Sequence, residues 1–194
     1  ETYLALPLGT VVHVDISPLL KDPAAAVDAA VVAHVPFANG VEFINETTLA
    51  VASTSSASVH LYSIAPGADS SAHPQLTLRS RVVLPFMPDH LSKASDGALL
   101  VAGHPHAPSL TKYVGVRHTC NSPEAYARAD DATRAYCANG RAGSWAAEWT
   151  EAGGLRNLYV GSDFPTSATC VWDKQRKTGI IAGLYAKGLL VWRD

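Results

Sequence analysis

The most informative part of this sequence is NGVEFINETTLAVA, residues 39–52, because its pattern occurs twice more. A polar residue heads an apolar stretch, and thirteen positions later an alanine closes a short hydrophobic run. The same spacing is found in DHLSKASDGALLVA, residues 89–102, and in TCVWDKQRKTGIIA, residues 169–182. Repeats of short strands at a period of about 40–50 residues are typical of propellers and arrays.

Each repeat also has a polar head and an aromatic end. The heads are Asn39, Asp89 and Thr169. About ten positions beyond each alanine, an apolar run ends at Tyr62, near Tyr113, and at Trp192. In a propeller the three polar heads would converge on one axis.

The rest of the chain also predicts an all-β fold. Residues 9–15 have the β-branched alternation of a strand, and residues 27–35 are either another strand or a turn of helix. Hairpin chemistry stands at equivalent places of the three repeats, in Asn45-Glu46, Ser95-Asp96-Gly97 and Lys177-Thr178-Gly179. Such a chain is a sandwich, a barrel or a propeller, and the equal repeat spacing favours the propeller.

The composition excludes some partners. With 47% hydrophobic and 16% charged residues, the chain can bury a sizeable core. Its net charge of −2 and its lack of a basic block argue against nucleic acid, and no apolar run is long enough for a membrane span.

The cysteines predict a disulfide and an export pathway. Cys120 and Cys137 flank a polar segment inside an insertion at about residues 115–145, in which residues 122–138 have the composition of a helix. We expect these two cysteines to be bonded and Cys170 to be a buried free thiol. The alternative is three reduced thiols in a cytosolic protein. The sequon at Asn45 adds weight to a secreted glycoprotein.

The candidate site residues gather at the repeat heads. Oxygen atoms of Asn39 and Asp89, converging from two repeats, would suit a hard cation such as Ca²⁺; the alternative is that both cap turns. His104 follows the second repeat in Gly-His-Pro-His and could assist acid–base chemistry, ligate a metal or be structural. His90 adjoins Asp89, and strand alternation separates the two side chains unless the segment is bulged.

Taken in order, several motifs resemble the serum paraoxonase/arylesterase family. They are FANG at 37–40, MPDHLS at 87–92, GHP at 103–105 and GLYAKGLLVW at 183–192. The resemblance covers nearly the whole chain except the cysteine-bearing insertion, which looks like a fungal-type elaboration. It implies a six-bladed β-propeller with calcium in the central tunnel, of which residues 1–194 form roughly the C-terminal half.

The same resemblance implies residue roles. Asn39 and Asp89 match two ligands of the family's catalytic calcium ion, and His104 matches a histidine near the active-site mouth. His90 stands where the family has asparagine, and imidazole is a poor calcium ligand. The family's other ligands and its main catalytic histidines come from a half that is absent here.

We therefore expect a secreted, calcium-dependent hydrolase of small esters or lactones. The alternatives are a non-hydrolytic propeller, either a pseudoenzyme or a biosynthetic one, with an altered metal site, and a scaffolding propeller whose loops bind protein. Because an open half-ring exposes sheet edges, we expect a second polypeptide with the N-terminal blades, or a homo-oligomer. Its strands would pair with residues 189–192 or 10–12.

Overall fold

The fold is mostly β-structure in four antiparallel sheets, as a computed structural model shows, and this confirms the all-β prediction. No helix among the described residues is long and apolar enough to cross a membrane. The chain divides into two compact units, Glu1–Leu84 and Pro85–Asp194. The structure describes residues 5–67, 73–139, 142–186 and 188–193.

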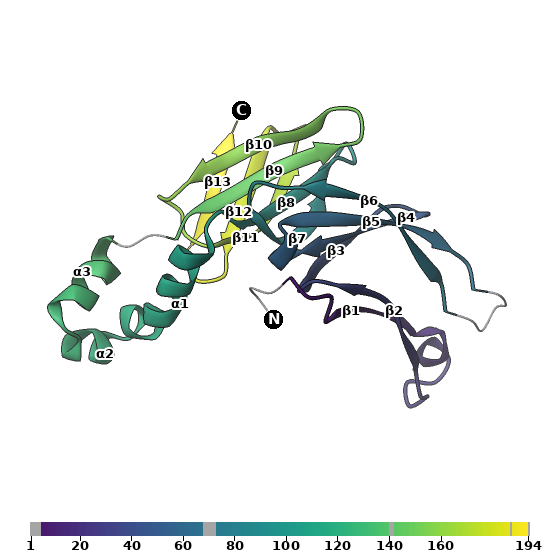
Figure 1. The fold of residues 1–194 in the computed structure, drawn as a ribbon, viewed down its shortest axis with the longest axis horizontal. Helices are drawn as coiled ribbons and strands as arrows, with labels where there is room; N and C mark the ends of the chain where they lie inside the picture. The colour runs from purple at the N-terminus through teal and green to yellow at the C-terminus, as the bar shows by residue number, and fades with distance from the viewer. Residues whose placement is uncertain (1–4, 68–72, 140–141, 187, 194) are drawn as a thin grey trace. The chain divides into compact units, whose positions relative to one another are not determined.

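The first unit contains a two-stranded and a four-stranded sheet (Figure 1). The smaller sheet pairs β1, Gly9–Asp15, with β2, Asp28–Val35, so both segments predicted near the N-terminus are strands. A short 3-10 helix, Ser17–Leu20, lies between them. The larger sheet has the strand order β3-β4-β5-β6. Its strands are β3, Ala38–Asn45, β4, Thr48–Ser53, β5, Ser58–Ala65, and β6, Gln75–Val83. A 3-10 turn, Thr54–Ser56, joins β4 to β5.

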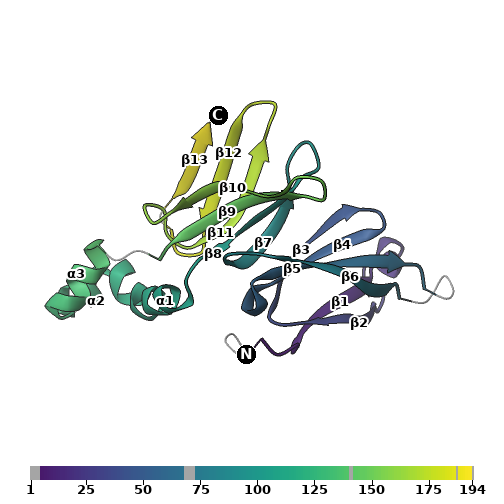
Figure 2. The same cartoon turned by 45° about the horizontal axis from the view of Figure 1, so that its top comes forward.

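The second unit contains a four-stranded and a three-stranded sheet, whose strands are seen side by side in Figure 2. The first sheet consists of β7, Met87–Lys93, β8, Leu99–His104, β9, Ser144–Thr150, and β10, Gly154–Gly161. The second consists of β11, Ser167–Asp173, β12, Thr178–Gly183, and β13, Leu189–Arg193. Strand β11 packs on β7 and β8, and the core between them includes Leu100, Ile181 and Trp172.

The repeat is structural: the first two hairpins share one register, and the third is shifted by one residue on its first strand. Each first strand carries a β-bulge at its head: between Ala38 and Val41, between Pro88 and Leu91, and between Ser167 and Thr169. Asn39 and Asp89 stand inside their bulges, and Thr169 follows its bulge, opposite Ala182. The middle strands β4 and β8 are buried along their whole length, as their apolar runs at 49–52 and 99–102 predict.

The third strands place three aromatic residues at one position. Tyr62, Trp149 and Trp192 each lie opposite the same repeat position of the middle strand. The prediction that the second repeat ends near Tyr113 is wrong, because that residue lies in a helix and the third strand is β9. A helical segment is inserted between β8 and β9. Strand β9 therefore does not follow β8 at the repeat spacing, and the spacing did not predict it.

Three helices form that segment: α1 at Ala107–Asn121, α2 at Pro123–Arg128 and α3 at Asp131–Asn139. The helical segment predicted at 122–138 is present as α2 and α3, and Ser122 caps α2 by accepting a hydrogen bond from the Ala125 amide. Helix α1 was not predicted, because its mixture of β-branched and polar residues has little helical periodicity.

The cysteine prediction is confirmed. Cys120 in α1 and Cys137 in α3 form a disulfide across 17 positions, and Cys170 is a free, buried thiol. Burial raises the pKa of the Cys170 thiol to about 12, so it stays protonated and unreactive at neutral pH.

Candidate functional site

The bulge at the head of β7 places one carboxylate between two imidazoles. Asp89 is buried within this bulge, and its Oδ2 lies 3.5 Å from Nε2 of His104, which ends the neighbouring strand β8. On the other side, Nε2 of His90 lies 4.0 Å from Asp89 Oδ1. Regular alternation would separate His90 from Asp89, so the bulge is what brings both rings to one carboxylate.

His104 is the more enclosed of the two histidines. It is 4% exposed, whereas the His90 side chain is 53% exposed. Within the described residues, Nδ1 of His104 is buried without a hydrogen-bond partner. A buried polar atom without a partner costs free energy, so such an atom suggests that a ligand or water completes the site.

Gly103 allows the backbones of β7 and β8 to approach each other closely. A Cβ at Gly103 would lie 2.0 Å from the carbonyl oxygen of Met87, so no side chain fits there. Because Gly103 has no side chain, the bulged strand β7 can approach the backbone immediately before His104. This is the close backbone contact that sets the distance between Asp89 and His104.

A buried pair of serines holds the same backbone in place. Ser167 Oγ donates to the Gly103 carbonyl at 2.6 Å and accepts from the Trp145 amide at 3.0 Å. The Ser167 amide in turn donates to Ser144 Oγ at 2.9 Å. Sequence reasoning missed both serines, because serine is common in loops and strands, and only the packing of β11 on β8 and β9 shows their role.

Asn39 occupies the equivalent bulge in the first unit. Its Nδ2 donates to Thr54 Oγ1 at 3.2 Å, and in the described part of the chain its Oδ1 accepts no hydrogen bond. The amide is thus oriented with its oxygen available, which is the atom a hard cation would use. Thr169, the third head, is half-buried in β11.

The structure therefore brings together Asp89, His90 and His104, while Asn39 belongs to the other compact unit. That Asn39 and Asp89 share one ion stays a prediction. Among the described residues, no group of three or more His, Cys, Asp or Glu side chains has the arrangement of a metal site. The oxygen donors available at the bulges suit calcium, and the imidazoles do not.

The comparisons with known proteins do not assign the chain to a family. No protein-family model matches the chain, and no curated protein matches it. The class that fold and site define is thus an antiparallel β-protein of repeated sheets with a buried Asp–His pair at a bulged strand end.

Proposed function

We propose that this protein is a calcium-dependent hydrolase of small esters or lactones. One observation carries the proposal: Asn39 and Asp89 stand in the same bulge of two equivalent sheets, and Asp89 lies beside the buried imidazole of His104. Oxygen-bearing side chains at a repeated register are suited to a shared cation, and an adjacent imidazole is suited to proton transfer.

The proposal includes a fold of higher order. The three repeated sheets would be blades of a six-bladed propeller of the paraoxonase/arylesterase type, with their bulges facing the central axis. The equal strand order of the three sheets, the shared bulge register of the first two and the bulge near the head of the third support this arrangement. Three repeats are fewer than six, so a second polypeptide or a second copy of the chain would supply the other blades.

The residues have distinct roles in this proposal. Asn39 Oδ1 and Asp89 Oδ1 would hold the ion, which when bound would polarise the substrate carbonyl. Asp89 Oδ2 faces His104 Nε2, so a proton on Nε2 would leave Nδ1 with its lone pair free. Nδ1 would then take the proton of the attacking water, and Ser167 would keep the backbone at His104 fixed.

His90 favours an alternative function. Its imidazole reaches toward Asp89 Oδ1 at 4.0 Å, where a hard oxygen ligand would serve calcium better. A non-hydrolytic propeller with an altered metal site would have this arrangement. The two functions differ in whether bound calcium is accompanied by hydrolysis.

Secretion is part of the same proposal. Disulfides persist in oxidising compartments, and the Cys120–Cys137 bond is consistent with one. Asn45 is exposed in the β3–β4 hairpin, where its Oδ1 accepts hydrogen bonds from Thr47 and leaves its Nδ2 free for a glycan. Mass analysis before and after glycosidase treatment tests the sugar at Asn45.

Calcium titration by calorimetry and hydrolysis of phenyl acetate and a γ-lactone test the activity. We expect chelation to abolish hydrolysis and Asp89→Asn to weaken calcium binding at least tenfold. His104→Gln should retain calcium but lose about 100-fold or more of the rate. Glu46→Gln, in an exposed hairpin, is the matched control and should change neither.

Two results would overturn the hydrolase. Calcium binding that depends on Asp89 without hydrolysis of either substrate would support the non-hydrolytic alternative. Hydrolysis that survives chelation, or that is equal in His104→Gln and the native protein, would exclude the roles given to the ion and to His104.

A further inference from the structure

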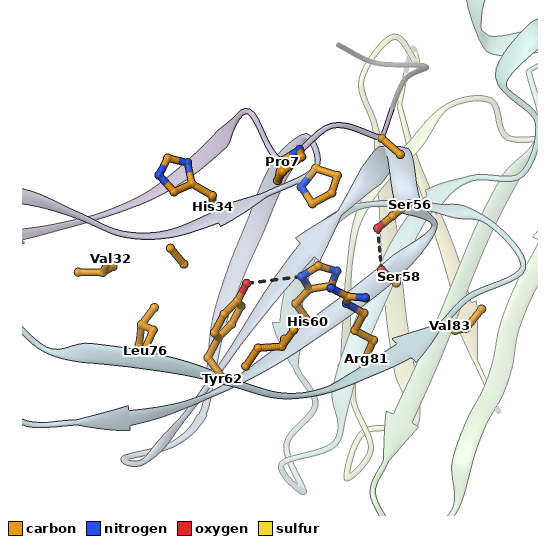
Figure 3. A pocket seen from close by; sticks show the side chains of 14 residues that line it. Pro7, Val32, His34, Ser56, Ser58, His60, Tyr62, Leu76, Arg81 and Val83 are labelled. Atoms are coloured by element: carbon orange, nitrogen blue, oxygen red, sulfur yellow. Dashed lines mark hydrogen bonds between the residues drawn. The ribbon is translucent and has the colours of Figure 1, made fainter.

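A cavity of about 660 Å³ lies within the first unit, whereas the Asp–His pair belongs to the second unit (Figure 3). Strand β2 forms one wall, and the facing side chains of β5 and β6 form the other. Its volume is in the range of small-molecule sites, about 300–1,000 Å³. The residues that matter for its chemistry are Val32, Ser58, His60, Tyr62, Leu76 and Arg81.

The repeat provides an internal comparison for His60. The positions equivalent to His60 in the third strands of the other repeats are Ala147 and Leu190. Two of the three sheets thus have an apolar residue where the first has an imidazole that is only 3% exposed. Since the sheet itself does not require a polar residue there, His60 indicates a role in the cavity.

His60 and Tyr62 project from the same face of β5 and are loosely connected. Tyr62 Oη and His60 Nδ1 are 3.5 Å apart, which is long for a hydrogen bond. Burial, and then the Arg81 guanidinium, lower the pKa of His60, while burial raises the pKa of Tyr62. Both groups are therefore neutral at pH 7 and can donate a hydrogen bond to a ligand.

Arg81 gives the cavity a net positive charge. It lies opposite His60 in the β5–β6 ladder, and its side chain reaches the same end of the cavity as His60 and Ser58 (Figure 3). No aspartate or glutamate is among the described residues that line the cavity. The planar guanidinium is suited to a carboxylate, which it can bind through two parallel hydrogen bonds.

The cavity also has an apolar part, although His34 and Ser56 add polar groups to its lining. Val32 and Leu76 face each other across it, away from Arg81 (Figure 3). A ligand that fits both ends has one negative group and an apolar body. We propose that the cavity binds a small organic carboxylate, with the carboxylate at Arg81, His60 and Tyr62 and the apolar body between Val32 and Leu76.

Calorimetric titration of the protein with 3-phenylpropionate and with its neutral amide, 3-phenylpropanamide, tests this site. We expect saturable binding of the acid and at least tenfold weaker binding of the amide. Arg81→Gln should weaken binding of the acid at least tenfold. Arg79→Gln is the matched control, because Arg79 is on the same strand but does not line the cavity.

His60→Ala separates a ligand role from a folding role. The sheet accommodates alanine at the equivalent Ala147, so the variant should keep its circular dichroism and bind the acid at least fivefold more weakly. No saturable binding, equal affinity for acid and amide, or equal losses in the Arg79 and Arg81 variants would overturn the proposal. Inorganic phosphate binding as tightly as 3-phenylpropionate would overturn the role of the apolar wall.

Discussion

Glu148 is a buried carboxylate in β9 at a position where the equivalent third strands have Leu61 and Val191. Its side chain is 11% exposed and contacts two cations: Oε1 accepts from Arg156 Nε at 2.6 Å, and Oε2 pairs with Lys174 Nζ at 2.8 Å. Both cations also lie over the Trp172 ring, at 4.9 and 4.8 Å from its centroid. We therefore expect Glu148→Gln to destabilise the second unit.

The size of the effect follows from the exposure of the partners. A hydrogen bond to a charged group contributes about 1.5–3 kcal/mol when water is excluded. Lys174 is 25% exposed and keeps most of this value, whereas the Arg156 side chain is 56% exposed and its pair is largely screened. The change from carboxylate to amide should thus cost about 2 kcal/mol of unfolding free energy at pH 7.

The effect should depend on pH in one direction. Burial raises the pKa of Glu148, but hydrogen bonds from Arg156 and Lys174 outweigh it and bring the pKa below its ordinary value. The unfolded chain, with the ordinary pKa, takes up this proton first as the pH falls. The stabilisation is present above the unfolded-state pKa and is lost as the pH falls through the folded-state pKa, so the deficit of Glu148→Gln shrinks as the pH is lowered below the ordinary range of glutamate.

Urea unfolding followed by tryptophan fluorescence measures this, because all 4 tryptophans lie in the second unit. Glu151→Gln, an exposed change in the β9–β10 hairpin, is the control and should stay within about 0.5 kcal/mol of the native protein. A Glu148→Gln value within the same limit, or a deficit equally large at a pH below the ordinary range of glutamate, would refute the reasoning.

Three further changes have expected outcomes. Replacing Cys120 and Cys137 by serine should remove about 3 kcal/mol from the helical segment, seen as faster amide exchange in α1–α3 and not in β8; equal exchange would contradict this. Gly179→Ala should cost about 2 kcal/mol in urea unfolding, because its Cβ would lie 1.9 Å from the Trp192 ring; an unchanged midpoint would show that the ring moves freely. His90→Asn should tighten calcium binding in calorimetry, since an amide oxygen is a harder ligand than imidazole; equal or weaker binding would place His90 outside the ion's shell.

The sequence predicted the repeated hairpins well because their pattern is local. An apolar middle strand, a turn and a polar head recur at fixed spacing, so the middle strands and the polar heads of the first strands are at the predicted places, whereas the bulges were not predicted. The third strand of the second repeat was missed because α1–α3 separate β8 from β9, and spacing cannot bridge an insertion. The disulfide could be predicted because it closes that insertion on itself.

The site was predictable only in part, for the same reason. Asp89, His90 and His104 are close in sequence and belong to one hairpin, so a local pattern could identify them. Ser167 supports this hairpin from 64 positions away, and Glu148 is met by Arg156 from β10 and by Lys174 from the turn after β11. Such contacts depend on how sheets pack, which no periodicity within one strand encodes.

The bulges connect the fold to the proposed chemistry. A bulge changes the direction of a side chain and leaves one residue out of the regular strand pairing. A hairpin can pair regularly without any bulge. Here all three first strands have a bulge near their head, and the two bulges of equal register hold an amide, Asn39, and a carboxylate, Asp89, while in the third strand the hydroxyl of Thr169 follows the bulge. Strand twist alone would explain the bulges but not the choice of oxygen-bearing residues beside otherwise buried strands. That choice is what a site built from equivalent positions of neighbouring sheets requires, and it is why the calcium titration of Asp89→Asn is the decisive measurement.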